Sequence, residues 1–80
     1  MEIAFEDLVL LNAELYRRGL RYRVSFQDDT TACIEPPGAC CLTPALEEAA
    51  YSCIDSYFQK KGLRPVYTAN RFKFTLEKAE

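Results

Sequence analysis

The sequence predicts an α+β domain with the element order α-β-β-α-β-β, in which two helices pack on one face of a four-stranded antiparallel sheet. Apolar residues recur at three-and-four spacing in two segments, residues 5–18 and 43–61, which is typical of amphipathic helices. Each segment is followed by two short stretches of alternating apolar and polar residues, as in a hairpin. One sheet covered by both helices buries these apolar positions together and leaves the opposite sheet face polar.

The first helix is expected from Phe5 to Arg18. Acidic residues in its first turn and arginines in its last turn complement the two ends of the helix dipole. Gly19 suits the left-handed conformation that ends a helix, and Leu20 is placed to fold back on Leu15 in a Schellman cap. The expected apolar stripe of this helix comprises Phe5, Leu8, Val9, Leu11 and Leu15.

A hairpin is expected next, with strands over residues 21–26 and 31–35 and a turn at residues 27–30, which read Gln-Asp-Asp-Thr. The alternation places one set of side chains toward the helices and the intervening polar set on the open face. The positions expected in the core are Tyr22, Val24, Phe26, Ala32 and Ile34.

The second helix has stronger boundary signals. Thr43 is a natural N-cap, and Pro44 fits the first helical position, where its missing N–H costs nothing. Lys60 and Lys61 favour the negative end of the helix, and Gly62 ends it. The sequence therefore predicts this helix from Pro44 to the last turn before Gly62.

The second hairpin is expected to pair residues 64–68 with residues 71–76 across a turn at Ala69 and Asn70. Pro65 cannot donate a ladder hydrogen bond, which favours an edge strand. The positions expected in the core are Val66, Phe72, Phe74 and Leu76.

The same helix ending occurs twice, as YRRGLR at residues 16–21 and FQKKGLR at residues 58–64. The glycines of the two phrases, Gly19 and Gly62, are 43 residues apart (62 − 19), and the apolar positions Leu11 and Ile54 coincide at the same offset. We interpret the chain as one domain over residues 1–80, with a candidate internal repeat whose half-units cover about residues 4–36 and 43–77.

Composition and charge exclude several classes of protein. The chain has 80 residues and a net charge of −2, which gives no bulk attraction to nucleic acid or anionic lipid. Its first residues are acidic, unlike a signal peptide, and no apolar stretch approaches the length of a membrane span. We therefore expect a soluble, cytoplasmic protein without membrane contact, whose cysteines are reduced.

Four cysteines are the first candidates for site chemistry. They contain no C-x₂-C pair, so we expect no metal and no other cofactor. Cys40 and Cys41 precede the second helix, whose dipole favours a thiolate, and are candidate reactive thiols; the alternative is that they are ordinary loop thiols. Cys53 is expected in the core. The chain has no histidine to act as the base of a cysteine hydrolase, and the acidic pairs Asp28-Asp29 and Glu47-Glu48 are sequence neighbours, which point apart. We therefore predict no catalytic residues and no enzymatic activity.

Basic residues on the predicted strands give the second candidate. If the halves are related by an approximate two-fold axis, a cationic strip on the open sheet face can bind a nucleic-acid strand. The residues of this predicted strip are Arg21, Arg23, Arg71, Lys73 and the neighbouring Tyr67. Against this, the other aromatic positions face the core and cannot stack on bases, and edge strands use cations to stay soluble. We therefore predict a small regulatory or accessory module that binds another protein, with nucleic-acid binding as the alternative.

Overall fold

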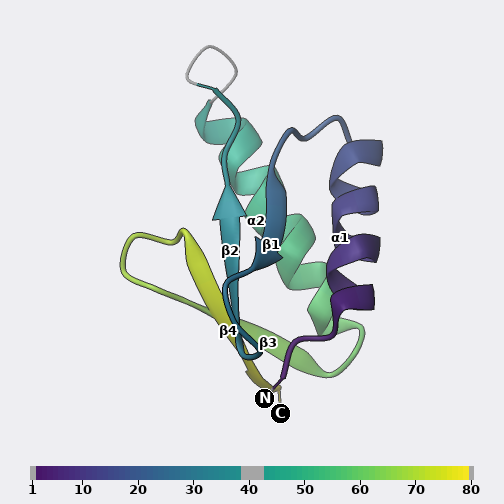
Figure 1. Ribbon diagram of the computed structural model, residues 1–80. Helices are drawn as coiled ribbons and strands as arrows, with labels where there is room; N and C mark the ends of the chain where they lie inside the picture. Colours follow the sequence, from purple (N-terminus) through teal and green to yellow (C-terminus); the bar gives the residue numbers. More distant parts are fainter. Residues whose placement is uncertain (1, 39–42, 80) are drawn as a thin grey trace.

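The computed structural model describes residues 2–38 and 43–79 and confirms the predicted α+β fold with its element order (Figure 1). In chain order the elements are α1 (Phe5–Arg17), β1 (Arg23–Phe26), β2 (Thr31–Glu35), α2 (Pro44–Gln59), β3 (Leu63–Tyr67) and β4 (Lys73–Lys78). Every strand pair is antiparallel, and the strand order is β1-β2-β4-β3. The central strands are therefore β2 and β4, while β1 and β3 form the two edges.

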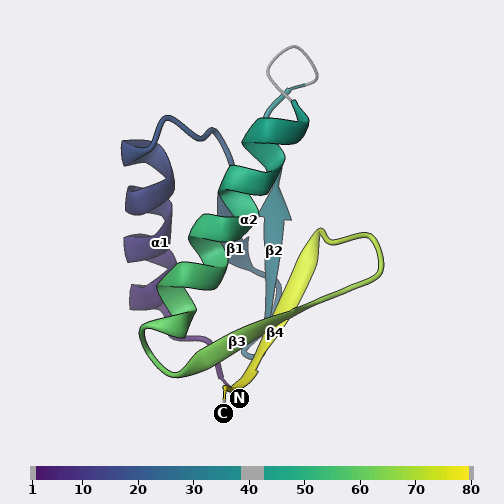
Figure 2. The same ribbon diagram turned by 180° about the vertical axis from the view of Figure 1, so that it is seen from behind.

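Both helices lie on one face of the sheet and run in opposite directions (Figures 1 and 2). α1 packs against β1, α2 packs against β3, and the two helices also contact each other. The opposite sheet face has no helix in the described part of the chain. Its side chains are mostly polar, as predicted, and include Ser25, Thr31, Lys73 and Thr75.

The core lies between the helices and the sheet as a single cluster. Its centre consists of fully buried side chains from three elements: Leu11 and Leu15 of α1, Ile54 and Phe58 of α2, and Phe74 of β4. Burial of each such side chain contributes about 1.5–3 kcal/mol relative to an exposed position. The rings of Phe58 and Phe74 lie 5.8 Å apart and join α2 directly to the central strand.

The predicted helix endings are confirmed. Gly19 and Gly62 have φ values of 74° and 75°, in the left-handed region that favours glycine. At the end of α1, the amides of Gly19 and Leu20 donate to the carbonyls of Tyr16 and Leu15 at 3.0 Å each. This pair of hydrogen bonds is the Schellman cap that the sequence predicts, and it directs the chain from the helix toward β1.

Polar side chains define two further boundaries. Thr43 caps α2, because its hydroxyl accepts a hydrogen bond from the Leu46 amide at 3.2 Å. Asp28 forms the predicted first turn: its carboxylate accepts from the amides of Thr30 and Thr31, both at 2.9 Å. These hydrogen bonds, led by that from the Thr30 amide, lower the pKa of Asp28. Both boundaries therefore follow from contacts within three residues of sequence.

The predicted face assignment of β3 is wrong by one residue. We expected Val66 in the core, but Val66 is 41% exposed, whereas its neighbour Pro65 is buried in the strand Leu63–Tyr67. Side chains alternate between faces, so a shift of one residue reverses the face of every position. The observed register lets the ring of Tyr67 pack against Phe74 at 5.8 Å on the helix side. Pro65 does lie in an edge strand, as predicted.

Besides Val66, two side chains expected in the core, Phe26 and Phe72, are exposed, and so are Phe5 and Val9 of the apolar stripe predicted for the first helix. Phe5 and Val9 are 69% and 49% exposed, because they lie on the side of α1 that extends past β1. Phe26, at the end of the edge strand, is 39% exposed. Phe72 is 47% exposed and belongs to the turn, since β4 begins only at Lys73. The second turn therefore takes up more residues than the two that the sequence predicts.

The internal repeat remains a hypothesis. The order β1-β2-β4-β3 is symmetric about the central β2–β4 pair, which a two-fold relation between the halves requires. The two edge strands differ, however, because the inward positions of β1 include Val24 and those of β3 include Pro65. Similar helix endings and a symmetric strand order are compatible both with duplication and with two independent solutions to the same packing problem.

Candidate functional site

The predicted basic strip does not form a single surface. Arg71 lies in the turn before β4, and its guanidinium stacks over the ring of Tyr51 at 4.1 Å. Tyr67 also faces the helices, where its hydroxyl donates to Asp55 of α2 at 2.8 Å. Arg71 and Tyr67 therefore lie on the helix side of the sheet, not on the open face where both were expected.

The other three residues of the predicted strip are spread over separate strands. Arg23 of β1 lies opposite Glu35, and Lys73 of β4 lies opposite Cys33, so β2 separates the two cations. Arg21 precedes β1 and lines a groove beside α1. Because Glu35 interrupts the row, these residues do not make a continuous cationic track for a nucleic-acid backbone.

The cysteines have different surroundings. Cys40 and Cys41 lie outside the described residues, so their reactivity stays a prediction. Cys53 is 1% exposed, which confirms the prediction of a core position, and burial raises the pKa of its thiol. Cys33 is half-buried on the open face, and its thiol donates to the side-chain oxygen of Gln27 at 3.2 Å. Burial and a raised pKa both disfavour the thiolate form of Cys53, which is the reactive form of a cysteine.

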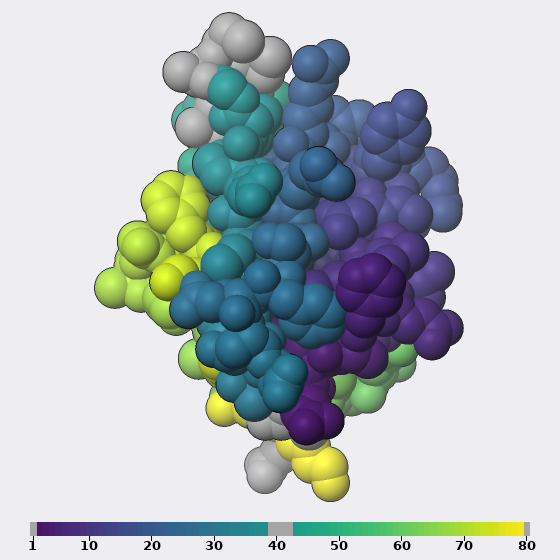
Figure 3. Space-filling model, in the orientation of Figure 1, coloured from purple at the N-terminus to yellow at the C-terminus, as the bar shows by residue number. Residues whose placement is uncertain are grey.

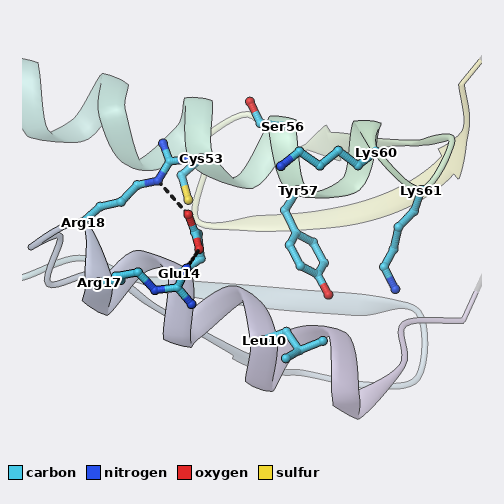
Figure 4. Close-up of a pocket in the computed structure, with 9 residues that line it drawn as sticks. All are labelled: Leu10, Glu14, Arg17, Arg18, Cys53, Ser56, Tyr57, Lys60 and Lys61. Carbon is cyan, nitrogen blue, oxygen red and sulfur yellow. Dashed lines mark hydrogen bonds and ion pairs between the residues drawn. The ribbon is translucent and has the colours of Figure 1, made fainter.

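A groove of about 520 Å³ separates α1 from α2 (Figure 4). Its lining includes Leu10 and Cys53 and four cations from the ends of the two helices: Arg17, Arg18, Lys60 and Lys61. Glu14 lies between the two arginines and forms ion pairs with Arg17 at 3.0 Å and with Arg18 at 3.1 Å. The hydrogen bond from Arg18 is the main reason that the pKa of Glu14 is lowered.

A second polar cluster joins the two helices at the other end of this groove. Tyr57 donates to Asp7 at 3.0 Å, and Lys61 forms an ion pair with the same carboxylate oxygen. Burial, together with the neighbouring Asp7, raises the pKa of Tyr57, which therefore remains a neutral donor. Most cations of the groove are thus engaged by carboxylates or by the negative helix ends. We interpret these polar contacts as contacts that hold the two helices together.

The α1–β1 flank, which consists of Phe5, Val9, Tyr16 and Phe26, carries an exposed apolar row. These are four of the seven large apolar side chains that are exposed in the described residues. The first three share one side of α1, because their spacing returns to nearly the same angle around the helix. Phe26 extends the row onto β1, with its ring stacked on Phe5 at 5.9 Å. Figure 3 shows α1 (purple) adjoining β1 (blue) on this side of the molecule.

A groove of about 630 Å³ continues this flank at the end of α1, and we call it the flank groove. Tyr16, which is 85% exposed, forms one wall, and Leu20 and Tyr22 contribute apolar surface. Arg21 and Arg23 also line it, and none of its described lining residues is acidic. The flank groove therefore combines apolar surface with positive charge.

Asn12 closes the outer edge of β1 beside this flank. The amide of Gln27 donates to the carbonyl of Thr31 at 2.9 Å, and bonded pairs recur at every second residue, so the backbone groups of Val24 point away from β2. The carboxamide of Asn12 donates to the Val24 carbonyl and accepts from the Val24 amide, both at 2.8 Å. A partner at this flank therefore meets side chains at the middle of β1, not unpaired backbone.

Sequence analysis did not identify the flank. Phe5 and Val9 were counted in one apolar stripe together with Leu8, Leu11 and Leu15, and Tyr16 was given no role. A signal was present, because residues 5, 9 and 16 form a second row roughly 100° around the helix from the core row of Leu8, Leu11 and Leu15. Only the position of β1, however, shows that this second row is left uncovered.

Within residues 2–38 and 43–79, no group of three or more metal-ligating side chains is arranged to hold an ion. In the same part of the chain, neither helix has the length and apolar character that a membrane crossing requires. Comparisons with known proteins found no matching family model, no similar curated protein and no similar solved structure.

Proposed function

We propose that the protein is an interaction module of the regulatory or accessory kind, which binds another protein in the cytoplasm and has no catalytic activity of its own. The observation that supports this proposal is the exposed apolar row of the α1–β1 flank. Exposed apolar side chains that gather on one side of a folded protein are typical of an interaction site. Aromatic side chains such as Phe5 and Tyr16 are also enriched among the residues that dominate binding energy.

The charges beside the flank favour a partner segment that combines apolar and acidic residues. Arg21 and Arg23 line the flank groove next to Tyr16, and no acidic residue is among the described residues of that lining. An acidic side chain in the groove can pair with a guanidinium while an apolar neighbour covers the tyrosine ring. Exposed charge pairs contribute more to the rate of association than to affinity, so we expect a modest dependence of affinity on salt.

The surroundings of the thiols and cations support the remaining parts of the proposal. Cys33 and Cys53 are free thiols, which is compatible with a reducing compartment. Nucleic-acid binding has less support, because the predicted cations lie on different faces and the ring of Phe74 is fully buried, as expected, and cannot stack on bases. Protein binding through the flank is therefore the function that the geometry supports best.

Selection from a phage-displayed library of short linear peptides tests the proposal. We expect the wild-type protein to enrich sequences that contain both apolar and acidic residues. Tyr16→Ala should weaken binding of the corresponding synthetic peptides by about tenfold or more, the loss typical of a central interface residue. Phe72→Ala is the matched control, because it removes an exposed aromatic ring outside the flank and should leave the affinity within about twofold.

Three outcomes contradict the proposal: no enrichment, enrichment of basic peptides, or equal binding by both variants. Circular dichroism should show that Tyr16→Ala remains folded, since the side chain is 85% exposed and its loss creates no cavity. Tight binding of a single-stranded oligonucleotide, with an affinity that falls steeply with salt, would support nucleic-acid binding in place of protein binding.

A further inference from the structure

β3 forms the second edge of the sheet. Its outward backbone groups lack the kind of side-chain partner that Asn12 provides at β1 in the described residues. The amide of Thr68 donates to the carbonyl of Lys73 at 2.9 Å, and the amide of Ala79 donates to the carbonyl of Gly62 at 3.0 Å. Bonded residues recur at every second position of an antiparallel ladder, so the even-numbered residues of β3 face β4. The residues whose backbone groups point away from the sheet are Leu63, Pro65 and Tyr67.

We propose that this β3 edge binds an extended segment of a different protein as an additional antiparallel strand. Its three outward residues offer three carbonyls and, because proline has no N–H, two amides. No described side chain closes these groups as Asn12 closes those of Val24 at β1. Unpaired edge groups bind extended peptides by strand addition, in which main-chain hydrogen bonds provide affinity.

Pro65 makes a second copy of this chain a poor occupant. In the symmetric antiparallel pair that overlaps along the whole of β3, Pro65 lies opposite its own counterpart, while Leu63 lies opposite Tyr67. Each Pro65 carbonyl then faces the proline nitrogen of the other strand, which has no N–H, so both carbonyls stay unpaired at the middle of the interface. A strand with any other residue at that position supplies an N–H to the Pro65 carbonyl. The proline therefore selects against self-association and leaves the edge open to a different sequence.

A groove of about 320 Å³ is lined by residues of β3 and of α2. Residues of an added strand that lie opposite Leu63 and Pro65 direct their side chains to the helix side, toward this groove. Leu63, Pro65 and Ala79 give it an apolar lining, and the exposed carboxylate of Asp55 lies among its lining residues. We expect the bound segment to alternate apolar and polar residues, with a basic residue near Asp55.

This inference does not depend on the proposed role of the flank. β1 and β3 are opposite edges of the sheet, so a strand at β3 leaves the α1–β1 flank uncovered. The chemistry also differs, because binding at β3 uses backbone hydrogen bonds and binding at the flank uses side chains. Experiments on Tyr16→Ala protein therefore test the β3 edge with the flank disabled.

Amide hydrogen exchange on the wild-type protein tests the edge directly. We expect the amides of Leu63 and Tyr67 to exchange at least about tenfold faster than those of Arg64 and Val66, which face β4. Peptides selected from a phage-displayed library on Tyr16→Ala protein should then slow exchange at Leu63 and Tyr67. If these two amides are already protected in the monomer, or if no peptide slows their exchange, the proposal is wrong.

Backbone methylation of a selected peptide distinguishes strand addition from side-chain docking. N-methylation at the residue opposite Tyr67 should weaken binding by about tenfold, the equivalent of one lost hydrogen bond. Methylation at the next residue, whose N–H points to solvent, is the matched control and should change affinity by less than about twofold. Equal effects at both positions would show that the peptide does not pair with β3.

The role of Pro65 is tested by Pro65→Val, which restores the missing donor in a residue suited to strands. We expect the wild-type protein to sediment as a monomer and Pro65→Val to form dimers that protect the amides of Leu63 and Tyr67. A wild-type dimer that protects these amides would identify a second copy as the occupant and overturn the proposal. A monomeric, folded Pro65→Val protein would overturn the assigned role of the proline.

Discussion

Replacement of Asn12 should destabilise the fold through the edge of β1. In Asn12→Ala, the amide and the carbonyl of Val24 both lose their partner, each from a hydrogen bond of 2.8 Å. Asn12 is only partly buried, so water can reach the site and reduce the penalty for unpaired backbone groups. The expected loss is therefore that of two ordinary hydrogen bonds.

The magnitude follows from two opposing effects. A typical hydrogen bond contributes about 1 kcal/mol of net stability, so the pair contributes about 2 kcal/mol. Alanine is a better helix former than asparagine by about 0.5 kcal/mol, which offsets part of the loss in α1. We expect Asn12→Ala to lower the free energy of unfolding by about 1.5 kcal/mol, or the melting temperature by about 6–12 °C for a domain of this size.

Urea unfolding followed by far-ultraviolet circular dichroism measures this change, and the slope of the transition should stay unchanged. Asn12→Leu keeps the branched shape of the side chain but removes its hydrogen-bonding groups, and it should cost a similar amount if hydrogen bonds are responsible. Val9→Ala is the control on the same helix; it alters an exposed side chain and should shift stability by at most about 0.5 kcal/mol. Wild-type stability in both Asn12 variants would refute the argument, because water would then serve the Val24 groups equally well.

Two further predictions concern the core and the pH dependence of stability. Phe74→Ala removes a fully buried ring and should cost about 3–5 kcal/mol, whereas Phe72→Ala, in the exposed turn, should cost less than about 1 kcal/mol in the same urea assay. Burial and the hydrogen bond to Asp55 raise the pKa of Tyr67 above its usual value of 10.0. Below pH 10 this tyrosine is protonated in both states; above it the unfolded chain ionises and the folded chain does not, so stability should fall as pH rises further. Tyr67→Phe should flatten this decline, and an equally steep decline in the variant would show that other groups cause it.

Two of the predicted binding residues, Tyr67 and Arg71, lie on a different face from the one that the sequence predicts. Tyr67 was expected on the open sheet face, but β3 begins at Leu63 and the register shift turns its ring to the helices. Arg71 adopts a left-handed φ of 62° in the turn, and its guanidinium stacks on Tyr51. Sequence alternation does not decide which of the two faces of a short strand is buried. That choice depends on which side chains, such as the ring of Tyr67, pack against residues from distant parts of the chain.

The docking surfaces depend on strand order even more directly. A side chain such as Asn12 has no recognisable role in the sequence, because its two partners belong to Val24, twelve residues away. The sequence alone predicts an edge strand at Pro65. That Pro65 disfavours pairing of two β3 strands can be deduced only from the register of β3 with β4, which shows that its backbone groups point outward.

The sequence by itself determined the order of the elements, both helix endings and the first turn. These features depend on groups within a few residues of one another, such as Gly19 with Leu15 or Asp28 with Thr30. The tertiary structure alone decided which strands lie at the edges, which edge is closed and which apolar row of α1 stays uncovered. Such features arise from contacts between distant segments, whose energies depend on how the whole core packs and are not encoded in any single stretch of the chain.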